Sequence, residues 1–231
     1  MHDVTIRRVD HGYFVRPPEE TGTGAPRVEP CLGYLIDHND GMLLFDTGMG
    51  SDPAVDVHYR PRRRSLEDAL KAAGVLLSQI TLVANCHLHF DHCGGNPLLD
   101  GRPVFTQRIE LDAARHTADY TLPELIDTPG ARYEELDGEA EVLAGVTVLP
   151  TPGHTAGHQS LLVRHGDGTV VIVAGQSHDT ATAYSADVLA CRAHRDGHPP
   201  PLPVLTAWLH RLQELDPARV VFAHDHAVWV P

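Results

Sequence analysis

Short apolar runs, many of them alternating with polar residues, recur along the whole chain and are bounded by Gly, Pro, Asn and Asp. Runs of this length and pattern predict β-strands. We expect strands at residues 4–9 and 13–15 (a hairpin turning at His11-Gly12), 31–36 and 42–45 (a second hairpin), 81–84, 104–106, 142–143 and 146–149, 160–163 and 169–174, and 220–222.

Helical spacing appears between these strands. Ser65 is a good N-cap for a helix over 65–73, with Glu67 and Asp68 in its first turn and Gly74 after its end. Further helices are expected at 108–115, 181–189 and 204–215. Two strand-rich halves, each followed by helices, indicate an α/β fold in which two sheets pack face to face under helices. The length suits a single domain over residues 1–231.

Composition narrows the class of protein. A hydrophobic content of 42% without any apolar run of about 20 residues predicts a globular chain with no membrane partner. The start lacks the apolar core of a secretory signal, so we expect a cytoplasmic location. The net charge of −13 argues against a nucleic-acid partner and leaves a small-molecule substrate, with a monomer or homodimer. The four cysteines are spaced as reduced, buried thiols: Cys31, Cys86, Cys93 and Cys191.

The strongest chemical signal is the run His-Leu-His-Phe-Asp-His at 87–92, which follows the apolar residues 80–84 and precedes a Gly-Gly pair. A loop at a strand end can turn alternate side chains into one cavity. Imidazole with carboxylate is a ligand set that borderline divalent metals prefer. Other predicted strands also end in polar residues, namely at Asp46, His154, Gln176 and His224. Side chains converging from several strand ends therefore predict a metal site with several ligands.

These motifs together resemble a known family. Residues 82–96, Gln107-Arg108, Thr-Pro-Gly-His at 151–154, residues 157–161 and residues 222–225 are similar to the metallo-β-lactamase superfamily, and within it to the N-acyl homoserine lactonase branch. The resemblance implies an αββα sandwich and a hydrolase that opens a lactone or cleaves an ester with metal-activated hydroxide. It implies one or two zinc ions, with iron, manganese or cobalt as alternatives.

The resemblance also implies roles for individual residues. A first ion would be held by His87, His89 and His154, and a second by Asp91, His92 and His224. Asp91 would carry a proton to the leaving group, and Asp46 would orient a ligand histidine. The family's bridging carboxylate falls at Gln176, and its substrate-contacting Tyr falls at Asp179, unless Tyr184 reaches in instead. Gln176 and Asp179 are therefore candidate catalytic residues, with Asp179 or His178 as a substitute ligand, while His158 is expected to stabilise the ligand loop.

Other readings of the same motifs stay open. A thioesterase of the glyoxalase II kind would use the same ligands, and a degenerate member would bind metal without turnover. A flavodiiron-type protein should carry Glu where this chain has His89, and a nuclease should be basic. The resemblance also implies that the segment 51–64 is a loop near the substrate cleft. Its Arg62, Arg63 and Arg64 would suit a polar or anionic substrate, or would simply offset an acidic surface if the loop is only solvated.

Overall fold

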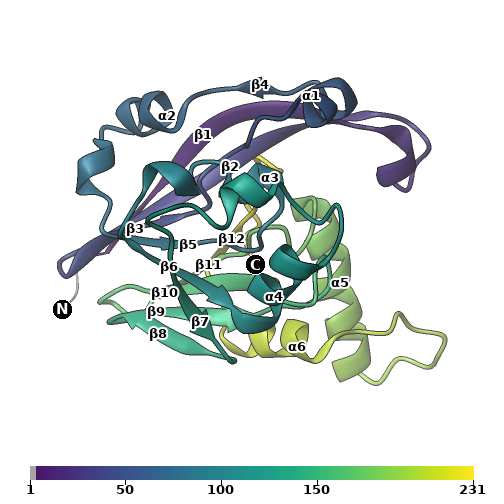
Figure 1. The fold of residues 1–231 in the computed structure, drawn as a ribbon. Coiled ribbons are helices and arrows are strands. Elements are labelled where there is room, and N and C mark those ends of the chain that lie inside the picture. Colours follow the sequence, from purple (N-terminus) through teal and green to yellow (C-terminus); the bar gives the residue numbers. More distant parts are fainter. Residues whose placement is uncertain (1–3) are drawn as a thin grey trace.

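The computed structural model describes residues 4–231 and consists of two β-sheets packed face to face with helices on both outer faces (Figure 1). The seven-stranded sheet has the order β4-β1-β2-β3-β5-β6-β7, and the five-stranded sheet has the order β12-β11-β10-β9-β8. The strands are β1 (Thr5–Arg16), β2 (Arg27–His38), β3 (Gly41–Phe45), β4 (Arg62–Arg63), β5 (Leu82–Ala84), β6 (Pro103–Gln107), β7 (Arg132–Leu136), β8 (Ala140–Leu143), β9 (Val146–Pro150), β10 (Gln159–Arg164), β11 (Val170–Val173) and β12 (Arg219–Val221).

Six α-helices and four short 3-10 helices connect these strands within the described residues. The α-helices are α1 (Pro53–Tyr59), α2 (Leu66–Ala72), α3 (Phe90–Cys93), α4 (Arg108–His116), α5 (Ala181–Arg195) and α6 (Ala207–Glu214). The 3-10 helices are η1 (Pro18–Glu20), η2 (Leu77–Gln79), η3 (Asn96–Leu98) and η4 (Pro123–Leu125). Over residues 4–231, none of the helices has the length and apolar character that crossing a membrane requires.

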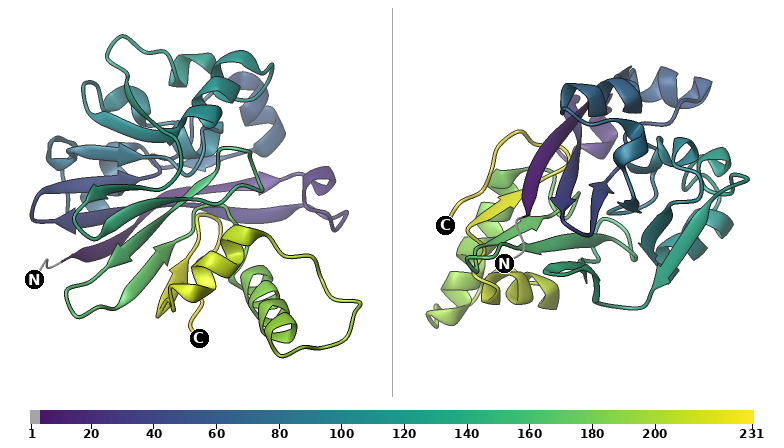
Figure 2. Two further views of the ribbon diagram at one scale, coloured as in Figure 1. Left: turned by 90° about the horizontal axis from the view of Figure 1, so that it is seen from below. Right: turned by 90° about the vertical axis from the view of Figure 1, so that its left-hand side faces the viewer.

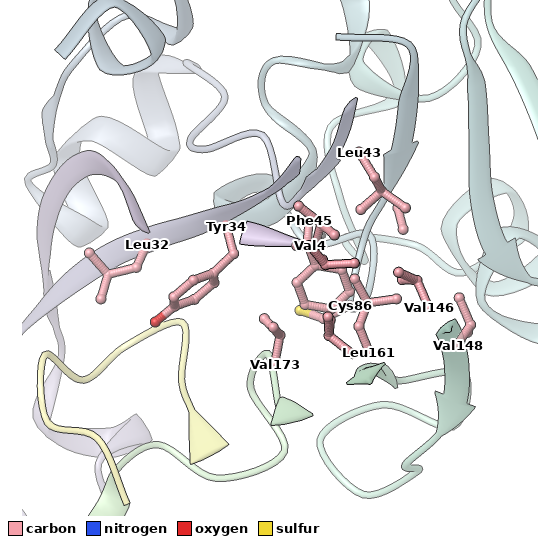
Figure 3. Packing of buried hydrophobic residues seen from close by; sticks show 13 residues of the cluster. Val4, Leu32, Tyr34, Leu43, Phe45, Cys86, Val146, Val148, Leu161 and Val173 are labelled. Carbon is pink, nitrogen blue, oxygen red and sulfur yellow. The ribbon is translucent and has the colours of Figure 1, made fainter. Parts of the chain in front are cut away.

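Alternation along the strands explains the layers, because successive side chains of a strand point to opposite faces of its sheet. In β3, Leu43 and Phe45 point into the core between the two sheets, while Leu44 points to the outer face. In β10, Leu161 faces the same central core and Leu162 faces outward. Figure 3 shows this central core, where side chains of both sheets meet. Its labelled members are Val4, Leu32, Tyr34, Leu43, Phe45, Cys86, Val146, Val148, Leu161 and Val173.

The outer faces of both sheets are covered by helices. Leu66 and Leu70 of α2 pack on the seven-stranded sheet. Helices α5 and α6 cover the outer face of the five-stranded sheet (Figure 2). Tyr184 and Val188 of α5 and Leu209 of α6 belong to the core cluster on that face. The predicted αββα sandwich is therefore confirmed, as is the Ser65 N-cap of α2, whose hydroxyl accepts from the Asp68 N–H at 3.1 Å.

Three local predictions were wrong. Residues 5–16 form the single strand β1 with a register shift between Asp10 and Tyr13, so Gly12 (φ +105°) marks a bulge and not a hairpin turn. Residues 51–64 contain α1 and β4, although none of the α1 side chains is buried and the segment therefore lacks an apolar period. Strand β7 was missed because its polar residues lie at the edge of the sheet.

The topology brings several strand ends to one edge of the sandwich. β3 and β5 are parallel neighbours in one sheet, as are β11 and β12 in the other. The two sheets are joined beyond β12, where the Leu32 N–H donates to the Ala223 carbonyl at 2.9 Å and the Tyr34 hydroxyl donates to the Phe222 carbonyl at 2.8 Å. The loops after these strands carry the polar side chains described next.

Candidate metal centre

The histidine-rich segment leaves β5 as an irregular loop and continues into the single turn of α3. The Gly94 N–H donates to the Gly48 carbonyl at 2.8 Å, so this loop lies directly on the loop that follows β3. A Cβ on Gly94 would lie 2.1 Å from the backbone nitrogen of Gly50, which leaves no room for a side chain. The Gly-Gly pair of the motif thus permits the close approach of two backbone segments.

Three histidines form the first group of candidate ligands, called the first ligand group below, although two of them are separated from the third by more than 60 residues. His87 Nε2 lies 3.1 Å from His89 Nδ1, and His154 Nε2 lies 3.2 Å from the same His89 nitrogen. His87 is buried, whereas His154 lies at the exposed end of the group. The loop after β9 therefore brings His154 to the histidines that follow β5.

The second group joins Asp91 and His92 of α3 to His224, which follows β12. His92 Nε2 lies 3.2 Å from His224 Nε2, and Asp91 Oδ2 lies 3.4 Å from both of these nitrogens. All three side chains are buried. The six residues that the sequence suggested as ligands thus form two compact groups, and each group combines residues from both sheets.

The geometry of each group fits a small divalent ion. With metal–nitrogen bonds of 2.0–2.1 Å, the ligand atoms of a tetrahedral site lie about 3.3–3.4 Å apart. The separations quoted above run from 3.1 to 3.4 Å. Imidazole and carboxylate donors are also the chemistry that such ions prefer. The donor set and its spacing therefore fit one ion in each group.

The protonation states suit ligation as well. Burial, reinforced by neighbouring imidazoles, lowers the pKa of His87 well below its usual value, and burial likewise lowers the pKa of His224. Burial would raise the pKa of Asp91, but His92 and His224 lower it strongly, so the carboxylate is ionised. Burial would lower the pKa of His92, but Cys86, Asp91 and Asp46 together raise it well above the usual range. A bound cation would displace that proton.

Contacts behind the ligands fix which ring nitrogen faces the centre. Asp46 Oδ2 accepts from His92 Nδ1 at 3.0 Å, which leaves Nε2 for the metal side, and Asp46 Oδ1 accepts from the Cys86 N–H at 2.8 Å. The Pro30 carbonyl accepts from His224 Nδ1 at 2.9 Å in the same way. Such outer contacts set the ring orientation of metal-binding histidines. The geometry is that expected for Asp46 as an orienting residue.

Gln176 lines the cleft over the centre, and Asp179, which contacts it, belongs to neither ligand group. The Gln176 amide Nε2 donates to Asp179 Oδ1 at 3.3 Å, and Asp179 Oδ2 accepts from Arg27 at 2.6 Å. The Gln176 backbone N–H donates to His158 Nε2 at 3.1 Å. His158 thereby contacts the strand-end loop through the nitrogen that a metal would need, which fits a structural role.

His178, a candidate substitute ligand, and Tyr184, a candidate substrate contact, both have their contacts away from the centre. His178 Nε2 lies 3.1 Å from Asp187 of α5, and its ring packs edge-on against Tyr184 with centroids 5.1 Å apart. Tyr184 is fully buried among the helices of the five-stranded sheet, and its hydroxyl accepts from Gln213 at 2.8 Å. Tyr184 therefore does not reach into the centre.

A cleft of about 400 Å³ opens over the ligand groups. It is lined by Phe14, Arg16, Glu20, Asp52, Ala54, Val55, Tyr59, His89, Phe90, Asp91, Asp119, Tyr120, Thr121, Leu122, His154 and Gln176. The aromatic wall near the second group includes Tyr59 and Phe90, whose centroids lie 5.0 Å apart, while Tyr120 packs against His89 at 4.7 Å. Arg62, Arg63 and Arg64 line a different cavity. The segment 51–64 thus contributes to the cleft through α1 and not through its arginines.

Glu110 is a residue that the sequence did not single out. Its carboxylate is buried on α4 and accepts from the Leu88 N–H at 2.8 Å, from the Thr155 hydroxyl at 2.7 Å and from the Tyr120 hydroxyl at 2.5 Å. One side chain therefore ties the two loops of the first ligand group to the wall of the cleft. The available signal was an acidic residue on the buried face of a helix, where a carboxylate needs partners.

The chain is an αββα sandwich that carries two adjoining groups of candidate metal ligands at one edge of its sheets. This combination of fold and site defines a class of metal-binding α/β proteins. The family model described as the metallo-beta-lactamase superfamily matches residues 26–224. The chain belongs to this superfamily.

Similar proteins include N-acyl homoserine lactonases from a Bacillus sp., 36% identical over 147 residues, and from Bacillus cereus, 34% identical over 160 residues. These alignments cover 58% and 62% of this chain and the same shares of the two relatives. The chain thus spans about three fifths of the curated relatives it matches. Among solved structures, a quorum-quenching N-acyl homoserine lactone hydrolase is 27% identical with a TM-score of 0.73, over 96% of this chain and 92% of the other.

Proposed function

We propose that this protein is a metal-dependent hydrolase that opens a lactone or cleaves an ester, in the manner of the N-acyl homoserine lactonases it resembles. The observation that carries the proposal is the pair of adjoining ligand groups at the floor of an aromatic-lined cleft. The similarity to lactonases supports it from sequence and from structure.

His87, His89 and His154 would hold the tighter ion, and Asp91, His92 and His224 the second. Zinc suits these neutral imidazoles and the carboxylate, and iron, manganese and cobalt suit the same donors. Such ions, when bound, lower the pKa of water to about 7 and polarise a carbonyl group. A cytoplasmic location, which the sequence predicts, would keep the four free cysteines reduced.

The remaining roles belong to the chain itself. Asp91 lies in the cleft and would carry a proton to the leaving oxygen. Gln176 supplies a neutral amide at the cleft, and Asp179, held by Arg27, orients that amide. Asp179 is a positioning residue in this proposal, because its carboxylate is already engaged by Arg27 and Gln176.

The proposal is tested by metal content and turnover measured together. Protein purified without chelator is analysed for metal and screened against lactones, simple esters and thioesters, with proton release as the readout. We expect bound metal and faster turnover of lactones or esters than of thioesters. Preference for thioesters would favour a thioesterase of the glyoxalase II kind, and metal without any turnover would favour a binding protein.

His89→Ala provides the matching site variant. His89 contacts both other histidines of the first group, so its loss should remove most bound metal and reduce turnover by at least about 100-fold. His116→Ala is the control, because His116 lies on the exposed face of α4, away from the cleft. Wild-type metal content and activity in His89→Ala would show that the first group is wrongly assigned.

A further inference from the structure

The sandwich is open where the edge strands of its two sheets meet. β12 ends the five-stranded sheet, and β1 pairs with β4 only at Gly12 and Tyr13, so within the described chain residues 5–10 have a strand neighbour on the β2 side alone. β1 and β12 lie next to each other here (Figure 2). A cavity of about 460 Å³ opens between them, and none of its described lining residues also lines the cleft over the ligand groups.

Strand alternation places two arginines of this cavity on the inner faces of the sheets. Ile6 packs against the central core, and Arg8 lies two positions later on the same face of β1. Val221 packs against that core from β12, and Arg219 shares its face. Both arginines are exposed and line the cavity. Charged side chains therefore occupy positions where a closed sandwich would have apolar ones.

The chain that follows β12 forms an apolar wall of the cavity. Trp229 forms an isolated bridge with Val220, in which each backbone N–H donates to the other's carbonyl, at 2.9 and 3.0 Å. The Trp229 side chain joins the core beneath α5 and α6, whereas Val228 and Val230 on either side of it line the cavity and are 46% and 60% exposed. An apolar ligand would therefore bury valine surface that folding leaves in water.

The composition of the wall is apolar and basic. Six of the ten described residues that line the cavity are Val, Ile or Tyr, and the other four are Arg8, His165, Arg219 and His226. None of the ten is Asp or Glu, although the chain has a net charge of −13. Within residues 4–231, neither guanidinium has a carboxylate at ion-pair distance, and their one side-chain hydrogen bond runs from Arg8 Nη1 to the His226 carbonyl at 3.4 Å. Most donors of both arginines are therefore available to a ligand.

The charges around the cavity favour an anion. Burial raises the pKa of Tyr34 on the cavity wall, and the strongest effect of a charged group on it comes from Arg8, which lowers the pKa, while Asp46 and Asp225 raise it. Asp46 is paired with His92, and Asp225 accepts from two backbone N–H groups. A cation bound by the ligand groups would add further positive charge. The cleft over those groups, by contrast, is lined by four carboxylates.

A carboxylate with an apolar chain fits both parts of this wall. A guanidinium can donate two parallel hydrogen bonds to a carboxylate, and the valines suit a hydrocarbon chain. The cavity volume lies within the range of small-molecule sites, roughly 300–1,000 Å³. We propose that this cavity is a second ligand site that binds a monocarboxylate with an apolar chain, whose carboxylate contacts Arg8 and Arg219. The site does not depend on the proposed hydrolase function.

Calorimetric titration of the protein, purified without chelator, with octanoate measures this site without turnover. Wild type should bind octanoate at one saturable site, about fourfold tighter for each CH₂ that octanoate has beyond hexanoate. 1-Octanol, which lacks the charge, should bind at least about fivefold more weakly. Arg8→Met and Arg219→Met should each weaken octanoate by at least about fivefold and change octanol by less than about twofold.

Two control variants locate the binding. Arg164→Met removes an exposed arginine of β10 that shares the outward face of Leu162 and lies outside the cavity, so octanoate affinity should stay within about twofold of wild type. His89→Ala disrupts the first ligand group and should also leave octanoate affinity unchanged. Loss of octanoate binding in His89→Ala would show that the carboxylate binds at the metal centre, which overturns the proposal.

Other results would overturn it as well. These are the absence of saturable octanoate binding, equal affinity of wild type and both arginine variants, and octanol binding as tight as that of octanoate. The last comparison needs only wild type, so it decides even if an arginine variant failed to fold. Light scattering completes the test: a dimer that dissociates on Arg8→Met or Arg219→Met would assign the cavity to an interface between two copies of the chain instead.

Discussion

Replacing Asp46 with Asn should weaken the second metal site selectively. Asp46 is 2% exposed, and both of its oxygens accept hydrogen bonds, one from His92 Nδ1 at 3.0 Å and one from the Cys86 N–H at 2.8 Å. Its left-handed backbone (φ +62°) is one that Asn also adopts readily. The substitution therefore changes the hydrogen-bond chemistry and leaves size and backbone almost unaltered.

The expected loss of metal affinity follows from the two N–H groups that donate to Asp46. An amide has a single oxygen, so each orientation of Asn at position 46 turns its NH₂ group toward another N–H. In the metal-free variant, loss of the Asp46 charge removes one of the interactions that raise the pKa of His92. Once neutral, the ring can relieve the contact by carrying its proton on Nε2, but metal binding needs Nε2 free and returns the proton to Nδ1. The cost then appears in metal affinity. Loss of a hydrogen bond to a charged acceptor costs about 1.5–3 kcal/mol, or about 10- to 100-fold in affinity.

Calorimetric titration of metal-free protein with zinc measures this effect. The equivalent bound by Asp91, His92 and His224 should weaken by that factor, whereas the equivalent bound by His87, His89 and His154 should change little. Asp37→Asn serves as the control, since Asp37 forms a half-exposed surface pair with Arg7 at 3.1 Å. Wild-type affinity for both equivalents in Asp46→Asn, or equal weakening of both, would refute the reasoning.

Two further predictions concern Gln176 and His11. Gln176→Asp adds a charged oxygen donor at the cleft and should raise the affinity for a second equivalent of metal, measured by the same titration; equal stoichiometry and affinity in both proteins would contradict this. Burial lowers the pKa of His11 from 6.5 to about 4, so the unfolded chain takes up this proton first as the pH falls. In chelator, wild type should therefore lose about 3 kcal/mol of unfolding free energy relative to His11→Gln between pH 6.5 and 4. Urea unfolding at several pH values measures this free energy, and the same pH dependence in both proteins would refute the prediction.

The sequence predicted the layered fold because hydrophobic alternation is a local property of each strand. It predicted which candidate ligands lie together because a motif as dense as His87 to His92 has few structural explanations and because polar residues follow several strands. It failed at α1, which is helical through the Asp52 cap and Pro53 although it buries no side chain. Hydrophobic periodicity carries no signal for such an element, and the Asp52-Pro53 start was its one local cue.

Long-range partners were also beyond the sequence. Glu110 ties two loops together through hydrogen bonds from the Leu88 N–H and the Thr155 hydroxyl, and these residues are 22 and 45 positions away in the chain. The same limit explains why the sequence suggested Arg62 to Arg64, and not Arg16, as cations of the cleft. A cluster of arginines is visible in the chain, but only the packing of β1 beside α1 and α3 shows which cation faces the cleft.

Each ligand group draws residues from both halves of the sandwich, and this makes any bound ion a cross-link as well as a reagent. His92 and His224 are 132 residues apart, and His89 and His154 are 65 residues apart. An ion that holds either pair closes a long loop of chain and restricts the unfolded state, much as a disulfide does. The chain has four free, buried cysteines and no disulfide among residues 4–231. Metal supply would therefore govern how long the folded protein persists, independently of how fast it turns over substrate.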